Sequence, residues 1–520
     1  MSWKSHIEEL RARERLAEQM GGEERVARQR SQGKLTARER VAFLADPGSF
    51  HEVGKIAGKA GYGPDDEIAE FLPATMVFGR ATLDGRPAVI LADDFTVRGG
   101  ASDASIAGKM LMAEQMAHEY GMPIVRMIDG TGGGGSVKSM EQNPRTYIPT
   151  TPAWEWLVAN MARAPVVALA LGPCAGLGAG RVATSHFSVM VKGLSQVFVA
   201  GPPVAKAIGE NVDKEGLGGW EINGRNGVVD NVVNSEHEAF EHARRFLSYL
   251  PANVEELPPI LPSEDDPNRK EDFLIDIVPK DGKTPYMPRK IIEAVCDKTQ
   301  EGQTTFFEIG SLWGRQVVTG LARIDGHPVA VLAGDPFFLD GAWTADACDK
   351  VVRHFDMADT FHLPIVHFVD CPGFAVGAKH ERAGVTRKGV RAMAAVYQVQ
   401  APILPVVIRK AYGLAGSAMF NPTRTRWRYC WPSGDWGSLP MAGGIEAAYK
   451  RQLEASADPE AELKELYRKF EAMRSPFRTA EAFIAEEIID PRDTRPLVVD
   501  FVKHAYRVLK TGPRANGMRP

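Results

Sequence analysis

Short runs of apolar residues recur along the chain and are separated by polar and glycine-rich turns. Such runs are typical of buried strands in a sheet. Between the first two runs, Ile106, Met110, Ala113 and Ala117 recur at helical spacing, which predicts a helix with one apolar face. Strands that alternate with helices predict an α/β fold. The clearest runs are residues 88–92, 124–128, 166–171, 329–333, 365–369 and 404–409.

The pattern of the first half returns in the second half at a nearly constant spacing. Residues 79–94 correspond to residues 320–335, which lie 241 positions later. The same offset relates three further pairs, namely Lys109 and Lys350, Pro123 and Pro364, and Asp129 and Asp370. One long duplication indicates two homologous domains rather than a solenoid of many short repeats. We therefore predict a tandem duplication of one α/β domain.

A segment rich in proline and acidic residues, 251–273, separates the two copies. This composition is typical of a linker. A chain of 520 residues also exceeds what one hydrophobic core usually holds. We place the boundary near residue 262, which gives an N-terminal half of residues 1–262 and a C-terminal half of residues 263–520.

Charge and composition exclude several classes of protein. A net charge of −4 argues against a nucleic-acid-binding protein, which should carry a basic surplus. The first 20 residues mix acidic and basic side chains and lack the apolar segment of a secretory signal. No run of about 18 apolar residues occurs, so we expect no membrane-spanning helix. The five cysteines are scattered and form no CxxC pair, so we expect reduced thiols, a cytoplasmic location and no metal site.

Each half carries two glycine-rich turns directly after predicted strands. They are residues 129–135 and 172–180 in the first half and 370–378 and 411–416 in the second. Glycine lets the backbone approach a ligand closely, and two such turns can direct two N–H groups at one oxygen atom, forming an oxyanion hole. A helix that starts after Gly176 or Gly413 would add the partial positive charge of its N-terminus. Their repetition favours this interpretation over glycines that only make tight turns.

Motifs of other enzyme classes do not occur in the sequence. It has no G-x-x-x-x-G-K-[ST] loop for a nucleoside triphosphate and no G-x-S-x-G nucleophile turn, and residues 172–180 do not fit G-x-G-x-x-G. His237 and His242 would lie about 140° apart on a helix, so they do not match the zinc-binding H-E-x-x-H spacing. We expect both histidines on the surface. The basic and aromatic run 425–429 is isolated, and we interpret it as structural or interfacial.

These features resemble the carboxyltransferase subunits of biotin-dependent acyl-CoA carboxylases, the family of propionyl-CoA and methylcrotonyl-CoA carboxylase. The resemblance covers nearly the whole chain. It rests on segments 33–40, 46–50, 94–100, 172–176, 369–374, 409–413 and 490–495 and on Trp431 with the proline after it. Residues 130–134 and 223–227 depart from the pattern of the relatives, residues 379–380 differ from the propionyl type, and residues 373–377 are closer to the methylcrotonyl type. The sequence therefore does not identify the acyl group.

The resemblance implies a crotonase-like fold in each half. Acyl-CoA would bind to the N-terminal half and biotin to the C-terminal half of a neighbouring subunit, with a dimer as the minimal active unit and a hexamer as the usual assembly. The implied site residues are Gly132 or Gly133 with Gly176 or Leu177 for the thioester enolate oxygen, Gly377 or Ala378 with Gly413 or Leu414 for the ureido oxygen of biotin, and Phe374, Tyr412 and His380 as further contacts of biotin.

The resemblance also implies that carboxybiotin supplies both the CO2 and, after its release, the base. The protein then needs only to stabilise two oxyanions and hold the reactants close together. The chain has neither a triphosphate loop nor the Met-Lys-Met attachment site of biotin carriers. We therefore expect biotin to be carried on a separate chain, with a biotin carboxylase as a further partner.

Three other functions stay open at this point. A biotin-dependent decarboxylase subunit, with a membrane pump as its partner, would run the same steps in reverse. A crotonase-type hydratase or isomerase would need positioned carboxylates and usually has one copy of the fold. A non-catalytic scaffold would show no carboxylation after reconstitution with its partners.

Overall fold

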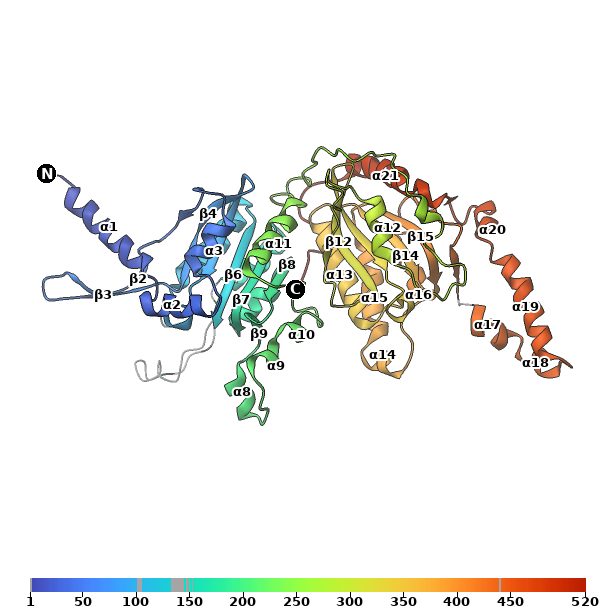
Figure 1. Cartoon of the computed structure of the whole chain (residues 1–520), viewed down its shortest axis with the longest axis horizontal. Helices are drawn as coiled ribbons and strands as arrows, with labels where there is room; N and C mark the ends of the chain where they lie inside the picture. Colours follow the sequence, from blue (N-terminus) through green and yellow to red (C-terminus); the bar gives the residue numbers. More distant parts are fainter. Residues whose placement is uncertain are drawn as a thin grey trace. The chain divides into compact units, whose positions relative to one another are not determined.

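The computed structural model divides the chain into two compact units (Figure 1). It describes residues 2–100, 105–131, 145, 148, 150–151, 153–438 and 441–520. Unit 1 consists of Met1–Glu256 together with Gly512–Pro520, and unit 2 of Leu257–Thr511. The boundary expected near residue 262 thus falls just inside unit 2, while the last residues of the chain return to unit 1.

An eight-stranded sheet forms the centre of unit 1. Its strands follow the order β1-β4-β5-β6-β7-β8-β10, and β9 pairs with β7. The pairs β1–β4 and β4–β5 are antiparallel, and the remaining pairs are parallel. The strands are β1 (His51–Glu52), β4 (Met76–Leu83), β5 (Arg86–Asp93), β6 (Ile124–Thr131), β7 (Val166–Ala175), β8 (Phe187–Val191), β9 (Gln196–Phe198) and β10 (Asn231–Val233), beside a separate hairpin of β2 (Gly58–Tyr62) and β3 (Ile68–Pro73).

The sheet of unit 2 repeats this topology, in the order β11-β12-β13-β14-β15-β16-β18 with β17 paired to β15. Even the register is kept, because Met76 pairs with Asp93 and Val317, 241 positions later, pairs with Gly334. The predicted duplication is therefore confirmed, and the predicted strands lie within β5, β6, β7, β13, β14 and β15. The strands are β11 (Phe307–Ile309), β12 (Val317–Ile324), β13 (His327–Gly334), β14 (Ile365–Cys371), β15 (Ile403–Tyr412), β16 (Tyr429–Cys430), β17 (Asp435–Gly437) and β18 (Glu487–Ile488).

Helices of unit 1 pack on its sheet. The predicted helix is α4, which contacts β4 and β5, while α11 contacts β7 and β8. The start of α3 shows why a helix begins there: the Thr36 side chain accepts from the Glu39 N–H, and the Glu39 side chain accepts from the Thr36 N–H. The helices are α1 (Lys4–Glu18), α2 (Glu23–Ser31), α3 (Ala37–Leu44), α4 (Ala107–Tyr120), α6 (Trp154–Asn160), α7 (Leu177–Ala183), α8 (Pro202–Ala207), α9 (Lys214–Gly218), α10 (Trp220–Asn223) and α11 (Glu236–Ser248).

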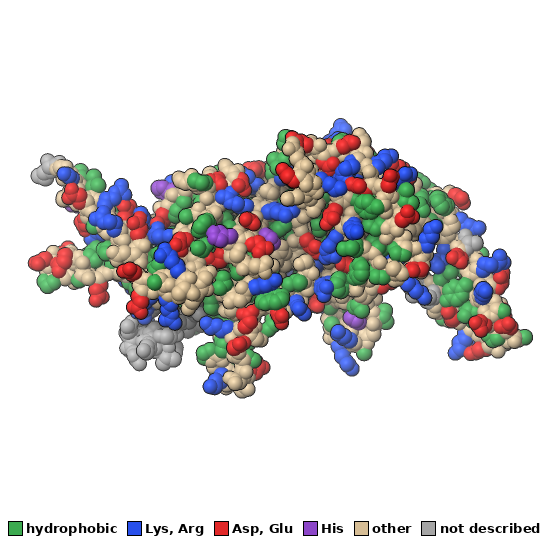
Figure 2. All heavy atoms as spheres, viewed as in Figure 1, with side chains coloured by type: hydrophobic (Ala, Val, Ile, Leu, Met, Phe, Trp, Pro, Cys, Tyr) green, Lys and Arg blue, Asp and Glu red, His purple; other side chains and the backbone are tan. Residues whose placement is uncertain are grey.

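In unit 2, α13 and α15 pack on each other, and α21 contacts α12, β12 and β13. The helices are α12 (Pro288–Val295), α13 (Ala345–Thr360), α14 (Ala378–Arg382), α15 (Val385–Gln398), α16 (Gly413–Gly416), α17 (Met441–Ala448), α18 (Lys450–Ala455), α19 (Pro459–Met473), α20 (Pro476–Glu481) and α21 (Thr494–Val508). Among the described helices of both units, none is long and apolar enough to cross a membrane. Acidic and basic side chains are interspersed over the visible surface (Figure 2).

Candidate active site

The carboxylate of Asp129 lies at the end of β6, where it is buried and faces two cations. Lys34 Nζ lies 2.7 Å from Oδ1, and Arg40 donates to Oδ2 at 2.9 Å. Arg40 also donates to the Leu171 carbonyl of β7 at 3.0 Å and pairs with Glu236 at the start of α11. These contacts fix the ends of β6 and β7, from which the two predicted glycine turns of unit 1 leave.

Gly172 is required by the space around this carboxylate. A Cβ atom at this position would lie 1.9 Å from Asp129 Oδ1 and 2.7 Å from Lys34 Nζ. Any side chain here would therefore displace the ion pair.

Gly176 turns the chain from β7 into α7. Its φ of 55° and ψ of −116° suit glycine and strain any other residue. Its N–H donates to the carbonyls of Val199 (3.0 Å) and Phe198 (3.3 Å), so this donor is already used. Leu177 begins α7, where the first N–H groups have no acceptor within the helix. Of the two predicted positions, the geometry favours Leu177 as the donor to a ligand.

Two buried side chains hold this turn in place. Arg181 of α7 donates to both carboxylate oxygens of Asp93, at 3.0 and 2.9 Å. Asn223, in a segment that departs from the family pattern, donates to the Val197 carbonyl at 2.8 Å and to the Gly218 carbonyl at 2.7 Å. Val197 and Phe198 both belong to β9, so Asn223 supports the strand that carries one acceptor of Gly176 and leads into the other, Val199.

Gly132 and Gly133 lie outside the described residues. Gly130, at the end of β6, has a φ of 146°. A Cβ atom there would lie 3.3 Å from Gly100 Cα, so Gly130 packs closely on the segment 98–100. The segment itself is left-handed, with positive φ at Arg98, Gly99 and Gly100.

A basic cavity of about 630 Å³ opens beside the segment 98–100. Phe95, Gly99 and Pro173 line it near the strand ends. Lys34 Nζ lies 4.7 Å from the centre of the Phe95 ring, so one cation connects the cavity to the Asp129 carboxylate. The remaining basic residues of the lining are Arg25, Arg28, Arg98 and Lys214. This combination suits a ligand with several negative charges.

Asp370 takes the equivalent place in unit 2. Arg409 of β15 donates from Nε to Oδ2 at 3.1 Å, and the Lys410 N–H donates to Oδ1 at 3.0 Å. The Arg409 guanidinium also lies 5.1 Å from the centre of the Tyr286 ring. Burial raises the pKa of Tyr286, which keeps this phenol neutral beside the ion pair.

The predicted turns of unit 2 leave one edge of its sheet. β14 and β15 remain paired up to Cys371 and Ala411. Gly413, with a φ of 61°, begins α16, and the exposed Leu414 follows. Gly377, with a φ of 120°, precedes Ala378 at the start of α14, and no described atom lies within 4 Å of where its Cβ would be. Both pairs of predicted donors thus lie on turns that follow adjacent strands.

The three side chains expected at biotin differ in their exposure. Tyr412 is 4% exposed, its hydroxyl accepts from Arg474 at 3.1 Å, and burial raises its pKa. Phe374 is half-buried against Gly389, whose Cβ would lie 2.7 Å from the ring. His380 is half-buried on α14. In this conformation Phe374 and His380 present part of their rings to solvent, whereas the Tyr412 ring is enclosed.

A family profile described as the carboxyl transferase domain matches residues 28–514. The chain belongs to the carboxyl transferase family. The propionyl-CoA carboxylase carboxyltransferase subunit of Haloferax mediterranei is 32% identical over 501 residues, which cover 95% of each chain. Methylmalonyl-CoA decarboxylase subunit alpha of Veillonella parvula is 31% identical over 485 residues, which cover 92% of each chain.

A solved structure gives the same result for the fold of this carboxyltransferase. Transcarboxylase 12S, a hexamer with methylmalonyl-coenzyme A and methylmalonic acid bound, matches with a TM-score of 0.87 at 30% identity, over 100% of this chain and 98% of that one. The resemblance identified in the sequence is confirmed. Each unit has the crotonase-like fold that the resemblance implied, and the protein is an enzyme.

Several side chains that hold the candidate site together were not identified from the sequence. Lys34 and Arg40 lie in the segment 33–40 that carried the resemblance, but no role was predicted for them. One signal was available in the sequence. In the second half Arg409 is the cation that pairs with Asp370, but the equivalent position of the first half is Gly172. Asp129 therefore needs a cation from another segment. Arg181 and the basic cavity gave no comparable signal.

Proposed function

We propose that the protein is the carboxyltransferase subunit of a biotin-dependent acyl-CoA carboxylase, which moves a carboxyl group from biotin on a carrier chain to an acyl-CoA. The observation that carries this proposal is the pair of equivalent turns, β7–Gly176–α7 and β15–Gly413–α16. Two such turns supply backbone donors for two oxyanions. A hydratase or isomerase needs one.

We assign the acyl-CoA to unit 1. Coenzyme A carries several phosphate groups, and guanidinium groups bind phosphates through paired, charge-assisted hydrogen bonds. Arg25 and Arg28 line the basic cavity, which adjoins the Gly130 turn. The thioester oxygen would accept from the Leu177 N–H and from Gly132 or Gly133. Unit 1 thereby stabilises the negative charge that forms on this oxygen when the α-proton leaves.

We assign biotin to unit 2, whose residues fit its ureido ring. Leu414 is 57% exposed at the start of α16, and Gly377 leaves open space beside it along the same sheet edge. The N–H groups of Leu414 or Gly413 and of Gly377 or Ala378 would bind the ureido oxygen, with the accessible face of Phe374 and His380 beside the ring. When bound, carboxybiotin supplies CO2 in the site. The chain contributes orientation and two oxyanion sites.

The partners follow from this division of work. Biotin is attached to a separate carrier, and a biotin carboxylase loads it. The hexameric state of transcarboxylase 12S supports a homo-oligomer, with a dimer as the minimum, in which unit 1 of one subunit works with unit 2 of another. A carboxylase subunit and a decarboxylase subunit are similar to this chain to the same degree, 32% and 31% identical, so we infer that the partner subunits set the direction. All five cysteines are buried and unpaired, which supports a cytoplasmic location.

The proposal is tested by reconstitution with a biotin carboxylase and a biotinylated carrier. With ATP, labelled bicarbonate and a panel of acyl-CoAs, label should enter an acid-stable product only when all three proteins are present. Hydration or isomerisation of enoyl-CoA without carboxylation would favour the crotonase-type alternative. If the carrier is shown to be carboxylated but the complete mixture carboxylates none of the acyl-CoAs, the result would favour a non-catalytic scaffold.

The assignment of acyl-CoA to unit 1 has its own test. Replacing Arg25 and Arg28 together by alanine should raise the KM for acyl-CoA about tenfold or more and leave the KM for the carboxylated carrier unchanged. Arg11→Ala, on the exposed face of α1, is the matched control. Equal effects on both KM values would contradict the assignment.

A further inference from the structure

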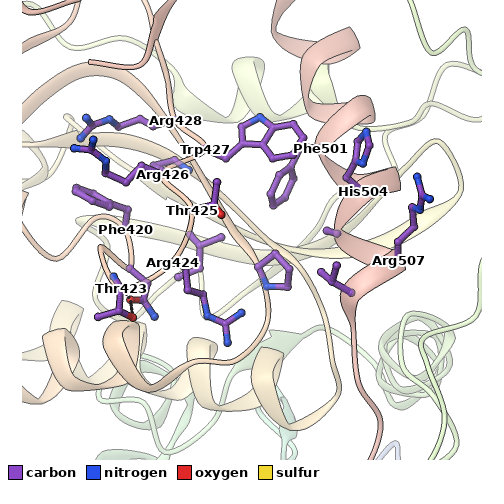
Figure 3. Close-up of a pocket in the computed structure, with 16 residues that line it drawn as sticks. Phe420, Thr423, Arg424, Thr425, Arg426, Trp427, Arg428, Phe501, His504 and Arg507 are labelled. Atoms are coloured by element: carbon purple, nitrogen blue, oxygen red, sulfur yellow. Dashed lines mark hydrogen bonds between the residues drawn. The ribbon is translucent and has the colours of Figure 1, made fainter. Parts of the chain in front are cut away.

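Unit 2 holds a second cavity, of about 880 Å³, at the start of β15 (Figure 3). Its apolar lining includes Ile403, Trp427 and Phe501. β15 runs from Ile403 to Tyr412, so a strand about 30 Å long separates this cavity from the Gly413 turn. The cavity is therefore separate from the proposed transfer site. Its positive side chains are Arg424, Arg426, Arg428 and Arg507, with His504 beside them.

The equivalent place in unit 1 is closed. Leu169 of β7 and Val406 of β15 are equivalent, and they pair with Val189 and Tyr429. Two residues before these partners lie Phe187 and Trp427, which are therefore equivalent to each other. The Phe187 ring stacks on Phe246 of α11 with centroids 4.7 Å apart, and both residues are 0% exposed.

In unit 2 the same position is half-open. The Trp427 ring lies 5.5 Å from that of Phe501 on α21, and part of it faces the cavity. The connection before β8 spans residues 184–186, whereas the one before β16 spans residues 417–428 and carries three of the arginines. The second copy has thus gained a basic segment at a position that the first copy fills with packed rings.

Two of the arginines have no carboxylate partner among the residues that the structure describes. Arg428 and Arg426 share Glu486, at 2.7 and 3.4 Å. Within the part of the chain that the structure describes, no ion pair involves Arg424 or Arg507. Figure 3 shows these two side chains reaching out from different sides of the apolar centre, below and to the right of Trp427 and Phe501.

We propose that this cavity binds a nucleotide, that is, a planar base with a phosphate chain. The base would pack on the open face of Trp427, as flat rings do on aromatic side chains. The phosphates would pair with Arg424 and Arg507, since guanidinium groups match phosphate oxygens. The volume lies within the range of small-molecule sites, and the lining comes from three short segments, residues 402–405, 420–428 and 501–508.

The test is calorimetric titration of the assembled protein with ADP, on a background of Arg25→Ala with Arg28→Ala that weakens binding in the cavity of unit 1. ADP should bind, and the double variant Arg424→Ala with Arg507→Ala should raise its Kd at least about tenfold. Trp427→Leu should weaken ADP binding but leave the binding of inorganic pyrophosphate unchanged. Trp427→Phe, which keeps a ring, should retain most of the affinity for ADP and shows that the position tolerates substitution.

Arg451→Ala, an exposed arginine on α18, is the matched control and should leave the Kd for ADP unchanged. The proposal is overturned if ADP produces no binding heat, or if the double variant binds ADP as tightly as the parent. It is also overturned if a polyglutamate peptide, but not ADP, binds in a way that depends on Trp427 and the two arginines. If the parent does not bind ADP and the double variant no longer assembles, the proposal is overturned, and this face is a contact between copies of the chain.

Discussion

The two units place a carboxylate at the same strand end and neutralise it by different routes. Asp129 is paired with Lys34 and Arg40 from the N-terminal segment, whereas Asp370 is paired with Arg409 from the neighbouring strand. The duplication has therefore preserved the charge balance at this strand end and not any one contact. The reason is energetic, because a buried carboxylate without its cation costs several kcal/mol.

A second equivalent pair, Arg126 and His367, extends this comparison. Arg126 of β6 forms two hydrogen bonds with Glu114, at 2.6 and 2.8 Å. His367 of β14 instead lies with Nδ1 3.1 Å from the Met419 carbonyl, and burial lowers its pKa to about 4. Unit 1 thus buries an ion pair where unit 2 buries a neutral ring.

Disturbing the neutralised carboxylates should have the largest effect on stability. Arg409→Ala leaves Asp370 without its guanidinium, and Gly172→Ala places a Cβ atom where Asp129 and Lys34 now lie. We expect each to lower the free energy of unfolding by about 3–5 kcal/mol, measured by urea denaturation. Gly108→Ala is the matched control, because this helical glycine has open space around it. If Gly172→Ala is as stable as Gly108→Ala, the steric argument is wrong.

Proline substitutions at the starts of α7 and α16 should lower catalysis without preventing folding. Proline is tolerated in the first turn of a helix, where the N–H has no helical acceptor. Residues before a proline adopt an extended conformation, and the φ and ψ of Gly176 have the opposite signs. Glycine has no Cβ atom, so it adopts this mirror-image conformation freely and can precede a proline at position 177. Leu177→Pro should therefore fold while losing one oxyanion donor, and carboxyl transfer should fall about 10²–10³-fold.

Leu414→Pro should lower the rate to a similar extent by acting on the biotin side. Leu177→Ala and Leu414→Ala keep the N–H groups and serve as controls in the reconstituted assay. A Leu177→Pro variant with the turnover of Leu177→Ala would show that this N–H does not bind the reacting oxygen.

The buried histidines should make unit 2 sensitive to acid. The folded-state pKa of His367, about 4, lies below the value of about 6.5 in the unfolded chain, so the unfolded state binds more protons as the pH falls between these values. Stability should fall by up to about 3 kcal/mol over this range, and His354, with a pKa lowered to about 3 by burial, adds a loss of the same sign.

His367→Asn, whose amide can still donate to the Met419 carbonyl, should flatten this dependence when unfolding in urea is compared at pH 7 and pH 4. His6→Asn, at an exposed position of α1, should leave it unchanged. An unaltered pH dependence in His367→Asn would mean that the ring is protonated in the folded state as well.

The smallest effect is expected at the equivalent lysines. Lys350 Nζ donates to three carbonyls, those of Gly310, Trp313 and Val317, at 2.8 to 3.0 Å, whereas Lys109 Nζ donates to Gly54 at 3.1 Å. Lys109→Met removes one hydrogen bond but also a desolvated charge, and these two effects oppose each other. The free energy of unfolding at pH 7 should therefore change by about 1 kcal/mol or less, whereas Lys350→Met should cost more. Burial lowers the pKa of Lys109 to about 8, so stability should rise between pH 8 and about 10.5 and should stop rising in Lys109→Met. An equal cost for both lysines in urea denaturation would refute this difference.

The sequence alone was sufficient for six buried strands and for the duplication, because both are visible as patterns along the chain. The glycine turns were expected near the right strand ends, although residues 172–175 and 411–412 continue β7 and β15. A buried strand is apolar wherever it lies, and the duplication shows directly as an offset of 241 between Asp129 and Asp370. The alternation of strands with helices gave the fold class for the same reason.

Contacts between distant segments could not be predicted in this way. Nothing in the sequence shows that Lys34 and Arg40 reach Asp129, or that Val199 accepts from Gly176. The enclosure of Tyr412 depends on Arg474, and the cavity beside Trp427 depends on how α21 packs. His242 was expected on the surface, yet it is half-buried, because its helix packs on β8 and β10.

The return of the chain to unit 1 has a consequence for its synthesis. Gly512 donates its N–H to the Val254 carbonyl at 2.6 Å, and Met518 is 3% exposed, so these two residues attach the segment 512–520 to unit 1. During translation, unit 1 therefore cannot bind the segment 512–520 until all of unit 2 has been synthesised. Unit 2 is in effect inserted into unit 1, and a protease that cuts near residue 257 leaves the two units joined through residue 511.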